Sequence, residues 1–180
     1  SYEKPLPEPL MIRSPLRKLA LLAGLTAVAS TAAIAGPPWI AIEYPTNPHN
    51  PATRDALLTV RTYHHGDLMS YYLTGTAEGI VNGRRQSMPL DIRRLPQPGI
   101  YAVRWQKPAQ GSWMLVIISS QEQNGPPAAT ALVTIDSRGG VASVNVPFDT
   151  IENGKWRVPR RVASAEIDGM LKGAETLARR

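Results

Sequence analysis

The sequence predicts a mainly β protein: a β-sandwich preceded by one N-terminal transmembrane helix and followed by a C-terminal amphipathic helix. Three observations support this fold class. Residues 19–42 contain no charged side chain, residues 57–147 alternate short apolar runs with turn residues, and residues 160–180 space apolar side chains at helical intervals. A chain of 180 residues suffices for one ordinary domain with appendages.

The composition excludes several classes of protein. With no cysteine, the chain has no disulfide framework, thiolate nucleophile, covalently attached c-type haem, or Cys-ligated zinc or iron–sulfur site. The formal net charge of +6 comes from basic residues scattered in pairs such as Arg84-Arg85 and Arg93-Arg94. Because no basic stripe or nucleic-acid motif accompanies them, we expect solvated surfaces or contacts with acidic lipids and partner proteins, and no nucleic acid.

Residues 1–18 are expected to form an extended cytoplasmic arm. Their four prolines and lack of apolar periodicity prevent a helix or a core. Burial within the arm itself cannot offset the entropy lost on fixing it, so an ordered arm requires a partner.

Residues 19–42, LALLAGLTAVASTAAIAGPPWIAI, are the predicted transmembrane helix. The stretch before the two prolines is long enough to cross the hydrocarbon core, and Trp39 is placed at the far interface. Basic residues precede the segment, whereas Arg54 is the first to follow it. We therefore expect a single-pass protein of the bacterial inner membrane, with a cytoplasmic N-terminus and a periplasmic main domain. The small residues of the segment suit helix packing, but they are equally common in signal peptides.

A cleaved signal peptide is the alternative interpretation. It would start at Met11 and end at the small-residue site Ala33-Ile34-Ala35, before Gly36. The chain opens at Ser1, a small residue of the kind that follows a removed initiator Met. We therefore expect a retained anchor.

Residues 43–56 are a tether rich in proline and asparagine, and residues 57–159 are the predicted periplasmic sandwich. Strands are expected at residues 57–63, 68–74, 87–93, 99–106, 112–119, 129–136 and 141–147. Residues 112–119 are apolar on both faces, so this strand is predicted to be central or covered by a partner. Residues 136–140, DSRGG, are predicted to be a hairpin connection.

Motifs between residues 57 and 119 resemble a known family. After an opening strand come GTAEGIVNGRRQSMPLDI, PGIYAVRW and GSWMLVI, so Gly-x-Tyr-x-Val-x-Trp precedes Gly-x-Trp-x-Leu-x-Ile. This pattern resembles the closing hairpin of bacterial periplasmic immunoglobulin-like modules, in particular the YtkA-like family and its membrane-anchored FixH-like relatives. The resemblance implies an immunoglobulin-like sandwich, and such modules are associated with copper handling or with assembly of redox membrane complexes.

Imidazole and thioether groups are suitable copper ligands. The candidate residues are His49, His64, His65, Met69, Met88 and Met114. His64 and His65 are adjacent in a strand or at its end, so their side chains are expected to point to opposite faces. Without a His-x-His or Met-rich cluster, we predict no metal site and no cofactor.

No serine, histidine and carboxylate arrangement predicts a nucleophile elbow, a zinc-protease helix or a phosphate loop. Asp67, Glu78 and Asp91 are single acidic residues in β-rich sequence, and we expect them in turns or on the surface. We therefore predict that the protein is not an enzyme and has no catalytic residue.

Residues 160–180 are predicted to form an amphipathic helix that lies on the sandwich, a partner subunit or the membrane interface. Ser164 is the expected N-cap, and Gly169 and Gly173 weaken the helix so that it needs a supporting surface. The preceding residues 155–161, KWRVPRR, are predicted to be an exposed linker that suits an acidic partner. The candidate partner-binding residues are Trp39, Lys155, Trp156, Arg157, Arg160 and Arg161.

These parts together predict a protein that attaches at several points. The layout resembles the single-pass periplasmic accessory subunits of bacterial photosynthetic reaction centre and light-harvesting assemblies, and an oxidase or other respiratory complex fits it too. We expect a non-catalytic accessory or structural subunit that binds other subunits of a membrane complex, and lipid through residues 19–42. The alternative is a periplasmic copper- or small-ligand-binding module or chaperone of YtkA-like type.

Overall fold

The structure is a computed structural model that describes residues 37–151, 154 and 156–178. The predicted arm and residues 19–36 of the predicted transmembrane helix lie outside the described residues. Within the part that is described, no helix is long and apolar enough to span a membrane.

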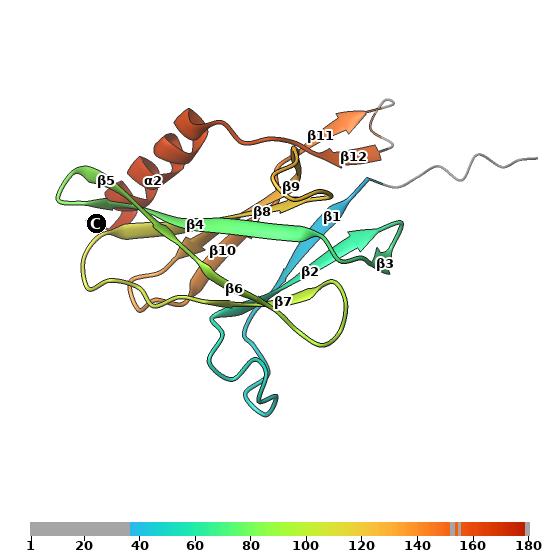
Figure 1. Cartoon of the computed structure of the whole chain (residues 1–180). Helices are drawn as coiled ribbons and strands as arrows, with labels where there is room; N and C mark the ends of the chain where they lie inside the picture. The colour runs from blue at the N-terminus through green and yellow to red at the C-terminus, as the bar shows by residue number, and fades with distance from the viewer. Residues whose placement is uncertain (1–36, 152–153, 155, 179–180) are drawn as a thin grey trace, which may run out of the picture. The chain divides into compact units, whose positions relative to one another are not determined.

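Two antiparallel sheets form a sandwich-like β structure (Figure 1). The first sheet has the order β1 (Trp39–Glu43), β2 (Leu58–His64), β7 (Ile100–Arg104) and β6 (Asp91–Arg94), with β3 (Asp67–Leu68) paired to β2. The second sheet has the order β10 (Val141–Asn145), β9 (Pro127–Ile135), β8 (Ser112–Ser120), β4 (Tyr72–Val81) and β5 (Arg84–Pro89). A separate hairpin of β11 (Phe148–Ile151) and β12 (Trp156–Pro159) precedes the helix α2 (Ser164–Ala178).

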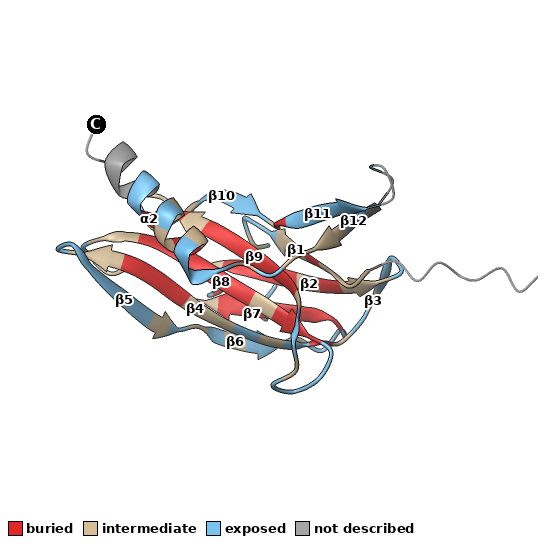
Figure 2. Cartoon of the chain, turned by 90° about the horizontal axis from the view of Figure 1, so that it is seen from above, coloured by how far each residue is buried: buried red, intermediate tan, exposed pale blue. Residues whose placement is uncertain are grey.

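The central strand β8 is buried on both of its faces (Figure 2). Trp113 and Leu115 belong to the core between the two sheets, whereas Met114 and Val116 belong to a second apolar cluster under α2. Each such side chain contributes about 1.5–3 kcal/mol on burial. The prediction that this strand is central is thereby confirmed. Its outer face is covered by a helix of the same chain and not by a partner.

The helix α2 supplies that cover. Its residues Ile167 and Leu171 are buried against Met114 and Val116 of the second sheet, which confirms an amphipathic helix lying on its own sandwich. The start of the helix differs from the expectation: the backbone amides of Glu166 and Ile167 both donate to the carbonyl of Ala163, at 3.0 and 3.3 Å. Ala163 therefore takes the cap position that had been assigned to Ser164.

Residues 39–42, predicted as the end of the transmembrane helix, lie in β1. Trp39 pairs with Tyr63 of β2, and Ile40 is fully buried in the core between the sheets. A strand forms here because β2 supplies backbone partners and alternate side chains meet the core. The sandwich therefore begins at β1. Its predicted start was residue 57.

Two other predicted strands are divided. Residues 68–74 contain the end of β3 and the start of β4, and residues 87–93 contain the end of β5 and most of β6. β5 and β6 belong to different sheets, so the chain changes sheet at Leu90, next to Pro89. Proline has no N–H for a sheet ladder, which favours a strand end at this point.

The connection between β9 and β10 is the predicted hairpin. The backbone amide of Asp136 donates to the carbonyl of Gly140 at 2.9 Å. The Asp136 carboxylate accepts from the amides of Arg138 and Gly140, both at 2.8 Å, and Gly139 has a φ of 89°. Glycine adopts this left-handed conformation without steric cost.

Two glycines should respond oppositely to alanine. A Cβ on Gly79 would lie 2.5 Å from Trp113 Cε3, whereas a Cβ on Gly169 in α2 would meet nothing within 4 Å. We expect Gly79→Ala to lower the free energy of unfolding by about 1–3 kcal/mol through overpacking. Gly169→Ala should raise it by about 0.5–1 kcal/mol through helix propensity. Urea denaturation followed by tryptophan fluorescence measures both, and equal effects would contradict the packing.

Candidate functional site

The predicted basic linker is one strand of the β11–β12 hairpin. Phe148 pairs with Pro159, and Thr150 pairs with Arg157, so these four residues share one face of the hairpin. The Arg157 guanidinium carbon lies 4.7 Å from the centroid of the Phe148 ring, which is a cation–π contact. The linker prediction is wrong because β11, which the sequence analysis did not identify, supplies a pairing partner.

The hairpin and the adjacent edge strand β10 expose apolar side chains. Phe148 is 38% exposed, Ile151 46% and Val144 43%. The hairpin is a two-stranded sheet of its own beside the second sheet (Figure 1). Sequence reasoning missed these three residues; the available signal was an apolar pair at 148 and 151 in a stretch without a core to bury it.

The basic residues around the hairpin differ in their partners. Arg160 is bound to Glu166 of α2 by two hydrogen bonds of 2.9 and 2.8 Å, and it lies 4.0 Å from Asp149. The Arg160 guanidinium holds the pKa of the Glu166 carboxyl below its usual value. By contrast, Arg157 and Arg161 are exposed and have no acidic partner among the described residues. The two arginines therefore keep charge available for a partner.

The structure does not bring together all the predicted partner-binding residues. Trp39 lies half-buried in β1 of the first sheet, and Lys155 lies outside the described residues. Trp156 pairs with Ile151 at the end of the hairpin. The surface that remains is formed by the exposed residues Phe148, Thr150 and Arg157 on one face of the hairpin, and we name it the hairpin surface.

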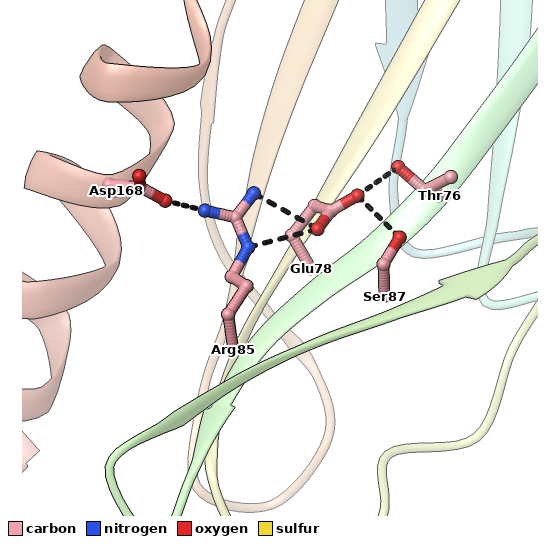
Figure 3. A network of polar contacts seen from close by, with 5 residues as sticks. All are labelled: Thr76, Glu78, Arg85, Ser87 and Asp168. Atoms are coloured by element: carbon pink, nitrogen blue, oxygen red, sulfur yellow. Dashed lines mark hydrogen bonds and ion pairs between the residues drawn. The ribbon is translucent and has the colours of Figure 1, made fainter.

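A charge network centred on the buried Glu78 joins α2 to the second sheet (Figure 3). Glu78 of β4 is 9% exposed and accepts hydrogen bonds from Thr76 at 2.6 Å and from Ser87 at 2.8 Å. Arg85 of β5 donates to the other Glu78 oxygen at 3.1 and 3.0 Å, and it also pairs with Asp168 of α2. The expectation of a surface Glu78 is wrong, because α2 covers this part of the sheet. Asp67 and Asp91 are exposed, as expected.

The candidate copper ligands are spread over the molecule. His65 has a φ of 56°, and its ring centroid lies 4.1 Å from that of His64. The prediction that these side chains point to opposite faces is wrong, because His65 leaves the strand in a left-handed turn. Met114 is buried under α2, whereas Met69 is 44% exposed. Among the described residues, no group of three His, Cys, Asp or Glu side chains could hold a metal ion.

The chain matches no protein-family model, no curated protein and no solved structure.

Removing Arg85 tests the charge network. Arg85→Met should leave the Glu78 carboxylate buried without a cation and lower the free energy of unfolding by about 2 kcal/mol or more. Asp168→Asn is the matched control, because the Asp168 side chain is 47% exposed and its loss should cost less than about 1 kcal/mol. Urea denaturation measures both variants. If both variants lose the same free energy of unfolding, the burial of the Glu78 carboxylate does not require Arg85.

The same network predicts an acid-dependent loss of stability. Burial raises the pKa of the Glu78 carboxyl, but hydrogen bonds from Thr76, Ser87 and Arg85 outweigh it, so the pKa lies below its usual value of 4.5. The folded state thus binds the proton more weakly than the unfolded state, and the contribution of Glu78 is present above pH 4.5 and lost as the pH falls through the folded pKa. Glu78→Gln should flatten the stability profile below pH 4.5. If the free energy of unfolding of this variant still falls below pH 4.5 as steeply as that of the unaltered protein, Glu78 is not the group responsible.

Proposed function

We propose that the chain is a non-catalytic accessory subunit, anchored in the bacterial inner membrane through residues 19–36, that docks on a larger bioenergetic membrane complex. The first candidate for that complex is a photosynthetic reaction centre with its light-harvesting ring. We include in the proposal an immunoglobulin-like topology for the sandwich, as the resemblance to YtkA-like and FixH-like modules implies. The main domain is then periplasmic.

One observation carries the proposal: Arg157 lies over the exposed ring of Phe148 and has no acidic partner among the described residues. Aromatic and arginine side chains are enriched among the interface residues that contribute most of the binding energy. A guanidinium that lies over a ring keeps its N–H donors, and a carboxylate of another protein can bind them in pairs. The hairpin surface therefore favours an acidic protein partner.

A small-ligand-binding module is the second candidate function. It is favoured by a cleft of about 380 Å³ on the first sheet, which is lined by charged and amide side chains. This candidate predicts an isolated protein that retains a ligand, whereas the accessory subunit is recovered with other chains.

Charge reversal on the hairpin surface tests docking. We expect the full-length protein, purified from its native membranes in mild detergent, to co-migrate with a pigment- or haem-bearing complex. Arg157→Glu should reduce its recovery with that complex by about tenfold or more, because the variant presents like charge to the acidic partner. Quantitative mass spectrometry of the complex, with intact-mass analysis of the chain, measures this.

Arg138→Glu is the matched control, because Arg138 is also exposed but lies in the hairpin between β9 and β10. It should co-migrate like the unaltered protein. A chain that is recovered alone, soluble and starting at Gly36 would overturn the accessory-subunit proposal and favour the ligand-binding module.

A further inference from the structure

The cleft lies on the face of the first sheet that points away from the core. Its floor is formed by Glu43 of β1, by Thr59 and Arg61 of β2, and by Ile100 of β7. Its walls are formed by residues of the 47–53 segment and the 95–97 loop. The volume of about 380 Å³ falls within the range of roughly 300–1,000 Å³ that is usual for small-molecule sites.

The floor holds one carboxylate in a fixed orientation. Three donors converge on a single oxygen, Oε2 of Glu43: Thr59 Oγ1 at 3.1 Å, Arg61 Nε at 3.0 Å and Arg61 Nη2 at 2.9 Å. The other oxygen, Oε1, has no hydrogen-bond donor among the described residues. Hydrogen bonding by Arg61 lowers the pKa of Glu43, so this oxygen stays an acceptor at neutral pH. The floor thus presents an open, ionised acceptor whose charge is balanced by the adjacent guanidinium.

One wall is held by its own side chains. The Oδ1 atom of Asn47 accepts from the amide of His49 at 2.9 Å, and the Oδ1 atom of Asn50 accepts from the amide of Ala52 at 3.0 Å. Thr53, which is 4% exposed, donates to the Asn47 carbonyl at 3.2 Å. The two side-chain amides use their oxygens within the wall, and their NH₂ groups have no partner among the described residues. They are therefore available as donors to a ligand.

The opposite wall combines apolar surface with one further amide. Leu95 and Pro96 provide carbon atoms, and Gln97 provides a side-chain amide. Backbone hydrogen bonds hold this loop on β7: Leu95 N donates to the Ile100 carbonyl at 2.9 Å, and Ile100 N donates to the Gln97 carbonyl at 3.3 Å. Both walls are thus set before any ligand arrives, which reduces the entropy lost on binding.

We propose that this cleft binds a neutral, polyhydroxylated small molecule of the sugar class. A hydroxyl group both donates and accepts, so neighbouring hydroxyls can donate to Glu43 Oε1 and accept from the amides of Asn47, Asn50 and Gln97. The carbon face of a sugar ring packs on Leu95 and Pro96. A charged ligand gains little, because the Glu43–Arg61 pair is internally neutralised. This inference rests on the second candidate function, whose ligand class it names, and the cleft shares no residue with the hairpin surface.

Saturation-transfer NMR on the full-length protein tests the proposal, in a detergent without a sugar headgroup. The probes are glucose, galactose and N-acetylglucosamine, with glucuronate and glucosamine as charged counterparts. We expect at least one neutral sugar to bind saturably with a dissociation constant on the order of millimolar, and its charged counterpart to bind more weakly.

Two variants localise the site. Glu43→Gln removes the ionised acceptor, and Gln97→Ala removes an exposed wall amide without touching the core; each should weaken binding by about tenfold. Gln86→Ala, an exposed glutamine on β5 of the second sheet, should leave binding unchanged. If the circular dichroism spectrum shows that Glu43→Gln disturbs the fold, the sugar affinity of Gln97→Ala decides whether the cleft is the binding site.

Three outcomes would overturn the inference: no saturable binding of any neutral sugar up to about 20 mM, tighter binding of the charged counterparts, or binding that both cleft variants retain. The proposed docking function is measured separately by co-migration with a membrane complex. Failure of either experiment therefore leaves the other interpretable.

Discussion

The fold depends on one constraint, the need to cover β8 on both faces. Trp113 and Leu115 require the first sheet on one side, and Met114 and Val116 require α2 on the other. Neither cover alone keeps the strand out of water. The covering helix in turn buries Glu78, and a buried carboxylate is tolerable because Arg85 and two hydroxyl groups satisfy it. The charge network is therefore a consequence of covering an apolar sheet with a helix.

This arrangement also decides which surfaces remain for a partner. The apolar face of α2 is occupied by its own sheet, so the residues Ile167 and Leu171 are not available to another subunit. The β11–β12 hairpin is different, because a two-stranded sheet has no core of its own. It is held at its base, where Arg160 binds Glu166 and its backbone amide donates to the Pro147 carbonyl at 3.0 Å. The base is fixed, and the apolar side chains beyond it stay exposed.

Local patterns predicted most of the fold, and long-range contacts explain what they missed. Short alternating or wholly apolar runs between turn residues located β2, β7, β8, β9 and β10, because such runs are local features of the sequence. β1 continues the uncharged run of residues 19–38, so residues 39–42 were predicted as the end of the transmembrane helix and not as a strand. The change of sheet at Leu90 and the burial of Glu78 depend on where β7 and α2 come to lie. The cleft had no sequence signal either, because Glu43 and Arg61 meet only when β1 pairs with β2.

The hairpin surface and the cleft lie on different parts of the sandwich, and this separation has a physical basis. The hairpin follows β10 and leads into α2, so the second sheet and its helix fix its position. The cleft is built on β1, β2 and β7, whose outward face carries Glu43 and Arg61 while the inward face carries Ile40 and Val60. The two surfaces share no residue, so substitutions at one surface should act on the other nearly additively.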